Sequence, residues 1–265
     1  MANPGELYTI PFSHYCELAR WSLHIAKIPF TEYPYLPGLH MFFSPVERIR
    51  KRAREAGTGK GSGTPLYVTG NGEVFDDSWQ VLKLTGLGDV PEDVFQTLNY
   101  VIGPRTRSVT YSDLLKDEQD GTFHEFGKTA PVSWWQHFLW GISGFRRTVA
   151  GKMRDQMVGD AERQAKGLQD LEEAIVKLEA ELAKPGSCFK ASNPDQLTAS
   201  AVALAALFAP AVLPPEYTGG LIPEMKLESF SPSHQQRINS WRERPLGKFT
   251  LEVYRKHRMA VVPAA

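Results

Sequence analysis

The sequence predicts a small α/β domain followed by an all-helical domain. Short β-favouring runs are confined to roughly the first 75 residues, and helical apolar periodicity dominates after about residue 92. A glycine- and proline-containing stretch at 86–91 separates the two parts. A chain of 265 residues is long enough for two domains, each with its own core. We therefore predict domains at 1–86 and 92–265.

The composition favours a small ligand over a macromolecular one. Thirty basic and thirty acidic residues cancel, which leaves no charge footprint for nucleic acid or an anionic membrane. Two cysteines, Cys16 and Cys188, are too few for a disulfide framework and lack metal-ligand spacing, so we predict no metal site. No apolar run approaches the ~20 residues of a membrane helix, and the N-terminus lacks a signal peptide. We expect a cytoplasmic protein.

The stretch from Glu6 to Arg20 is typical of a strand, a tight turn and a helix start. Residues 7–10 form a β-favouring run, Pro11 ends it, and a helical pattern follows from Cys16. Ser13 falls at the start of that helix, where a hydroxyl accepts hydrogen bonds from unpaired amides. A thiolate held above this turn would be stabilised by the helix dipole and by the hydroxyl.

The remaining strand signals predict a mixed sheet. Residues 29–35 alternate aromatic and polar side chains, and a helix over 14–27 supplies the crossover that a parallel second strand needs. Residues 64–69 form a third strand, which the turn at 70–72 joins to a fourth strand at 73–75. An Asn-Gly pair between apolar residues is a strong hairpin signal.

The connector from 36 to 63 has little pattern of its own. Its basic run at 48–54 is typical of a solvated helix, with a cationic rim for a carboxylate ligand as the alternative. The glycines at 57–63 suggest a phosphate loop. However, they follow a basic helix and lack a Lys-Ser or Lys-Thr pair after the second glycine. We interpret this stretch as a connector.

The second part of the chain reads as helices joined by short breaks. Leu197–Phe208 is apolar on all sides, which predicts the buried central helix, with Thr198 as its cap. Residues 116–129 read as a loop or a short insertion. The other helices are predicted over 79–84, over 94–115 with a bend at Gly103-Pro104, over 160–184 and over 236–257.

Three motifs together resemble the soluble glutathione transferases. Ser13-x-x-Cys16 is similar to the Cys-x-x-Cys of thioredoxin-like proteins with serine in the attacking position. With Arg20 and Trp21, it resembles the first helix of the transferase branch that uses serine or cysteine. Two further pairs, Pro65 with Leu66 and Asp77 with Ser78, match the family's glutathione-binding positions in order and spacing. One departure is Ala201, which stands where the family's central helix carries a capping aspartate.

The resemblance implies a thioredoxin-like domain that binds glutathione as co-substrate, followed by an all-α domain. In the family a cis-proline opens the third strand, its neighbour's backbone pairs with the cysteinyl part of glutathione, and the acidic residue and serine hold the γ-glutamyl group. The glutathione-binding residues so implied are Ser13, Thr64, Pro65, Leu66, Asp77 and Ser78.

The resemblance also implies an activity. Ser13 would stabilise the glutathione thiolate for attack on a small apolar electrophile, in a detoxifying, homodimeric enzyme. The helical domain would supply the second-substrate pocket, although aromatic residues at helical spacing are also typical of a core. A glutathione-dependent isomerase or lyase, a thiol transferase using Cys16, and a non-catalytic scaffold remain alternatives. The candidate pocket residues are Tyr100, Tyr111, Trp134, Trp135 and Phe138.

Overall fold

The computed structural model describes residues 4–41, 51, 64–116, 120–222 and 224–258. The predicted basic helix, apart from residue 51, and the glycines at 57–63 lie outside the described residues. Within the described part of the chain, no helix is both long and apolar enough to cross a membrane.

A four-stranded mixed sheet forms the N-terminal part, as predicted. Strand β1 pairs in parallel with β2 and antiparallel with β3, and β3 pairs antiparallel with β4, so the strand order is β2-β1-β3-β4. Helix α1 makes the crossover between β1 and β2, and a turn at 70–72 closes the hairpin. The strands are β1 (Gly5–Thr9), β2 (Phe30–Pro34), β3 (Leu66–Val68) and β4 (Val74–Phe75).

Helices α1 (His14–Ile25) and α3 (Ser78–Lys83) cover the same face of this sheet. Leu7 and Tyr67 point from β1 and β3 into a small core, where they meet Leu23 of α1 and Val81 of α3. The opposite faces of α1 and α3 contribute to a larger core that they share with the helical part of the chain.

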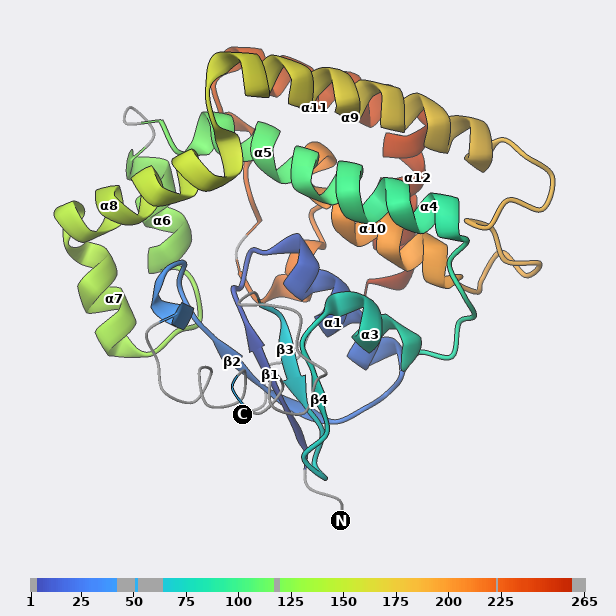
Figure 1. Ribbon diagram of the computed structural model, residues 1–265, viewed down its shortest axis with the longest axis horizontal. Coiled ribbons are helices and arrows are strands. Elements are labelled where there is room, and N and C mark those ends of the chain that lie inside the picture. The colour runs from blue at the N-terminus through green and yellow to red at the C-terminus, as the bar shows by residue number, and fades with distance from the viewer. Residues whose placement is uncertain (1–3, 42–50, 52–63, 117–119, 223, 259–265) are drawn as a thin grey trace.

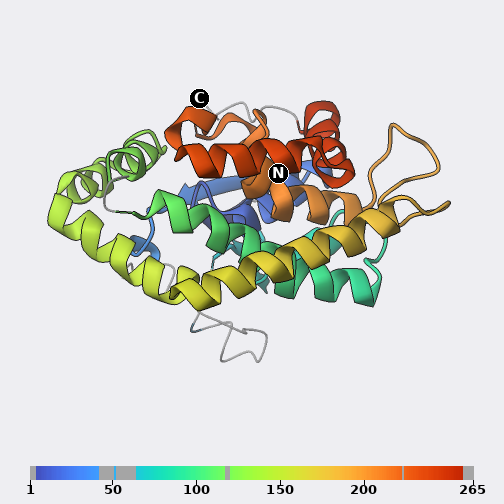
Figure 2. The same cartoon turned by 90° about the horizontal axis from the view of Figure 1, so that it is seen from above.

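The helical part stacks on α1 in layers (Figure 1). Helix α10 packs against α1 on one side and against α5 and α12 on others, and α9 lies across α5. Figure 2 shows α9 crossing the molecule from the α8 side to the far end. The helices are α4 (Glu92–Thr97), α5 (Gly103–Leu114), α6 (Asp120–Lys128), α7 (Trp134–Gly141), α8 (Ser143–Met153), α9 (Ala161–Leu182), α10 (Ala199–Val212), α11 (Pro232–Glu243) and α12 (Pro245–His257).

Helix α10 is the buried central helix that the sequence predicts. All 14 of its residues are buried, which is why the sequence is apolar around the whole circumference. The Thr198 hydroxyl caps it by accepting from the Ala201 amide at 3.1 Å. Because that hydroxyl also donates to the Cys188 carbonyl at 2.6 Å, the cap is anchored without the aspartate that Ala201 replaces.

The long helix is interrupted by a π-helical turn just before the position where a bend was predicted. Helix α4 continues through Leu98–Ile102 into α5, and the irregular turn stands directly before Gly103 and Pro104. Proline lacks the amide that the regular ladder needs, which accounts for a break at this point. Within the turn, Asn99 accepts from Tyr15 Oη through its carbonyl at 3.3 Å and from Trp79 Nε1 through its side chain at 2.8 Å.

The prediction of a loop at 116–129 is wrong, because residues 120–128 form α6. The sequence misleads here because Asp120-Gly121 is a turn signal and two glycines weaken the helical pattern. The helix is held by tertiary packing instead, since the fully buried Trp140 of α7 meets Phe123 edge to face at 4.9 Å.

The other helical predictions hold with small shifts. Helix α9 fills the predicted 160–184 segment, with the Asp160 side chain accepting from the Arg163 amide at 2.8 Å. The closing segment is two helices, α11 and α12, because Pro245 can begin a helix but cannot continue one.

Candidate functional site

The register of the sheet brings the sequence-predicted site residues to one edge. Strand β1 runs toward Ser13, and Tyr8 near its end pairs with Leu66, the first residue of the antiparallel β3. Strand β4 runs antiparallel to β3 and therefore ends, with Asp77 and Ser78 just beyond it, at the same edge. Three motifs that are far apart in the sequence are thus neighbours in space.

Ser13 is the N-cap of α1. Its backbone is extended, with φ −78° and ψ 126°, and its hydroxyl oxygen accepts from the Cys16 amide at 3.5 Å. A hydroxyl has one hydrogen to donate besides its acceptor sites, so capping leaves that hydrogen available. Ser13 is only partly buried. An anion placed over this turn would meet a hydroxyl donor and the positive end of a 12-residue helix.

Cys16 lies beneath this turn and has no exposed surface. Burial raises the pKa of its thiol, against the opposing effect of the hydrogen bond from the Ile10 amide. The Ile10 amide donates to Cys16 Sγ at 3.3 Å. A protonated, inaccessible thiol cannot attack a disulfide, so the structure disfavours Cys16 as a working nucleophile.

The Thr64-Pro65 peptide bond is cis, as the resemblance implies. Pro65 is buried and stands before Leu66, which has no exposed surface. The Thr64 side chain lies close enough to Cys16 to lower the pKa of its thiol, which places this segment beside the start of α1.

Asp77 and Ser78 open α3. Asp77 Oδ1 accepts from the Trp79 amide at 2.9 Å, which leaves Oδ2 without a partner among the described residues. The carboxylate is partly exposed, and its charge acts on the nearby Tyr15, where it adds to a burial-raised pKa of about 12. Ser78, in contrast, is buried, with an exposed fraction of 2%. Of these two side chains, that of Asp77 is therefore the more accessible to a ligand.

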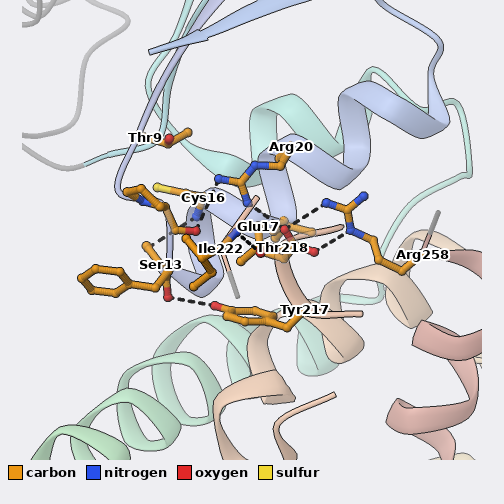
Figure 3. Close-up of polar contacts among 12 residues, drawn as sticks. Thr9, Ser13, Cys16, Glu17, Arg20, Tyr217, Thr218, Ile222 and Arg258 are labelled. Carbon is orange, nitrogen blue, oxygen red and sulfur yellow. Dashed lines mark hydrogen bonds and ion pairs between the residues drawn. The ribbon is translucent and has the colours of Figure 1, made fainter. Parts of the chain in front are cut away.

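A buried ion network behind Ser13 was not foreseen from the sequence (Figure 3). Glu17, one turn along α1, has no exposed surface and accepts from Arg20 at 2.8 Å and from Arg258 at 2.6 Å. Arg20 also pairs with Glu32 of β2 at 2.6 Å. The charged partners hold the pKa of Glu32 below its usual range despite its burial.

The turn itself is held from the C-terminal part of the chain. The Tyr217 hydroxyl donates to the Phe12 carbonyl at 2.9 Å across 205 residues of sequence (Figure 3). No local signal could have identified Tyr217 or Arg258, because their partners are chosen by tertiary packing alone.

A narrow cavity of about 20 Å³ opens beside Ser13, since both of its chain neighbours, Phe12 and His14, line it. Arg107 and Tyr111 of α5 form part of its wall. His14 Nε2 donates to the Gly103 carbonyl at 2.9 Å, and burial together with the charge of Arg107 lowers the pKa of His14 to about 3. His14 is therefore neutral at physiological pH.

The predicted pocket aromatics separate into different environments. Trp134 is 79% exposed, Phe138 66% and Tyr100 61%, so these three face solvent and form neither core nor cavity wall. Trp135 borders a surface groove with Tyr35 at the end of β2. Of the five candidates, Tyr111 alone borders the cavity beside Ser13.

Among the described residues, no group of three or more His, Cys, Asp or Glu side chains is placed to hold a metal ion. The reactive groups at this edge of the sheet are the Ser13 hydroxyl, the Asp77 carboxylate and the Arg107 guanidinium.

Comparison with known proteins identifies the fold. Sequence models of protein families give no match, and neither does a search of curated proteins. Among solved structures, glutathione transferase GSTFuA3 from Phanerochaete chrysosporium is similar with a TM-score of 0.53 at 12% identity, over 99% of this chain and 100% of that one. GSTFuA2 from the same organism gives 0.53 at 15% identity, over 98% and 100%. This chain therefore has the glutathione S-transferase fold, with a thioredoxin-like N-terminal part and a helical C-terminal part.

Proposed function

We propose that this protein is a glutathione transferase of the serine type. The observation that carries the proposal is the convergence of Ser13, the cis bond before Pro65, and Asp77 on one edge of the sheet. Each offers chemistry that a different part of glutathione needs.

Asp77 would bind the ammonium of the γ-glutamyl group through its unpartnered oxygen, because a charge-assisted hydrogen bond suits a partly buried carboxylate. The backbone of Leu66, at the start of β3, would pair with the cysteinyl part. Ser13 would donate to the thiolate. A free thiol has a pKa of about 8.5, and each unit of depression corresponds to about 1.4 kcal/mol of preferential stabilisation of the anion.

In the reaction, the thiolate attacks an electrophilic carbon held beside it. A carbon–sulfur bond forms, and the leaving group departs with its bonding electron pair. A glutathione-dependent isomerase or lyase would use the same binding groups. The predicted domain limits, the homodimer, the cytoplasmic location and a role in detoxification stay predictions.

The substitution Asp77→Asn tests glutathione binding. Asparagine retains the cap of α3 but removes the charge, so we expect the dissociation constant for glutathione to rise about 10-fold or more. Calorimetric titration measures it, with the exposed Asp89→Asn as the control. Equal affinities of the wild type and Asp77→Asn would contradict this binding mode. No glutathione binding by the wild type would overturn the proposed function and favour a scaffold role.

A further inference from the structure

The Arg107 guanidinium lacks a counter-ion. Within the part of the chain that the structure describes, no acidic side chain pairs with it and no hydrogen bond reaches it, and its Nε is buried without a partner. The guanidinium lies near the ring of Tyr15, whose centroid is 6.0 Å from Cζ. Such a contact contributes about 0.5–1 kcal/mol at exposed sites, which does not replace an anion.

Several other buried or half-buried arginines of the described chain are paired with a carboxylate. Arg105, two residues away on α5, pairs with Asp170 at 2.8 Å. Arg20 and Arg258 are both paired with Glu17. Because an unpaired charge is costly to remove from water, a partly buried cation without a partner indicates a place where a ligand supplies the negative charge.

The surroundings of Arg107 contain no competing anion. The described lining of the cavity contains no aspartate or glutamate. The titratable groups that face the guanidinium are neutral at physiological pH. Burial raises the pKa of both Tyr15 and Tyr111 to about 12 and is the main cause of the low pKa of His14. The guanidinium is therefore the single charged group of the described cavity wall.

Two other polar groups of the wall already donate to backbone carbonyls. Thr110 Oγ1 donates to the Pro210 carbonyl at 3.1 Å, and Tyr217 Oη donates to that of Phe12. An entering ligand thus meets mainly apolar surface, the Tyr111 hydroxyl and one fork of N–H donors. Guanidinium pairs best with a carboxylate, because both are planar and two parallel hydrogen bonds can form.

The size of the cavity agrees with this. One water needs about 10–15 Å³ measured in this way, so about 20 Å³ accommodates a carboxylate but not an aromatic ring. The remainder of such a ligand would stay outside the cavity, and it would lie near Ser13 because both chain neighbours of Ser13, Phe12 and His14, line the cavity.

We propose that the second substrate is an electrophile that carries a carboxylate, and that Arg107 binds this carboxylate in the cavity beside Ser13. This inference rests on the proposed transferase function. It makes Arg107 a specificity-determining residue that distinguishes acids from neutral analogues of the same shape.

Two isosteric electrophiles test the inference: 4-chloro-3-nitrobenzoate and 4-chloro-3-nitrobenzamide. Both react by attack of the glutathione thiolate on the carbon that bears chlorine, with loss of chloride. We expect Arg107→Met to lower kcat/KM for the benzoate relative to the amide by about 10- to 100-fold, the effect of a hydrogen bond to a charged group. Arg107→Lys should retain part of the preference, and the control Arg105→Met should retain all of it.

The outcomes separate the inference from the proposed function. An equal loss of activity toward both electrophiles, with a raised thiol pKa of bound glutathione, would assign Arg107 to the thiolate and overturn the inference. If the wild type turns over neither compound, the proposed function fails. In that case, calorimetric titration of each compound into the wild type and Arg107→Met, with S-methylglutathione present, tests whether Arg107 binds the carboxylate. Tighter binding of the benzoate by the wild type but not by Arg107→Met supports it, and equal binding overturns it. Circular dichroism confirms that each variant is folded.

Discussion

Ser13 and Cys16 belong to one motif but differ in their exposure to solvent. Ser13 caps α1 at a partly exposed turn, whereas Cys16, one turn later, is inaccessible and has a raised thiol pKa. The difference follows from helix geometry, because the first residue of the motif precedes the helix and the last faces the sheet. A sequence can show both groups but cannot show which of them meets solvent, so the thiol transferase alternative became weaker only with the structure.

His14 provides a test of burial at the same turn. The unfolded chain protonates this imidazole near pH 6.5, while the folded protein resists protonation until about pH 3. Protons therefore favour the unfolded state, and stability is lost as pH falls below 6.5. Between pH 7 and pH 5, the wild type should lose about 2 kcal/mol more unfolding free energy than His14→Gln. Urea unfolding at the two pH values measures this; parallel losses in both proteins would show that His14 is not buried as described.

At the scale of elements, α6 and α7 show how packing overrides local propensity. Trp140 of α7 is fully buried, donates from Nε1 to the His124 carbonyl at 3.2 Å, and lies directly over Gly127. A glycine that weakens the helix in isolation is what allows the indole to approach it. The sequence pattern of α6 therefore indicates a loop, and the helix is intelligible only with its partner in place.

Gly127→Ala should accordingly destabilise the protein, since the added Cβ would collide with the Trp140 ring, which has no room to move. Overpacking of this kind costs about 1–3 kcal/mol. Gly121→Ala is the control near the start of the same helix, where no described residue lies within 4 Å of the added Cβ, and it should not destabilise the protein. Thermal unfolding of both variants measures these changes in stability. An unchanged stability of Gly127→Ala would contradict the packing described.

For the whole molecule, the helical part positions the turn that holds Ser13. Arg258 pairs with Glu17 across 241 residues of sequence, and Tyr217 holds the Phe12 carbonyl. Trp21 of α1, Trp79 of α3 and Tyr254 of α12 also belong to one continuous core. The turn that holds Ser13 is therefore oriented by residues from the C-terminal part of the chain.

A feature could be predicted from the sequence where neighbouring residues determine it, and could not where distant residues determine it. The strands, the cap at Ser13, the hairpin and α10 were predicted because propensity and periodicity act over a few residues. The site motifs were found through the family resemblance, and their convergence follows from strand register. Arg107 and the Glu17–Arg258 pair could not be found in this way. Their significance depends on which side chains surround them, and many of those come from segments far away in the sequence.

The most direct test of the central claim is the thiol pKa of bound glutathione, measured from the ultraviolet absorbance of the thiolate as pH is varied. In the wild type we expect a pKa one to three units below the free value of about 8.5. Ser13→Ala should return it toward 8.5, while Ser13→Thr, which retains both hydroxyl and cap, should keep it low. An unshifted pKa in the wild type, or the same low pKa in Ser13→Ala, would contradict the assignment of Ser13 as the thiol-activating residue.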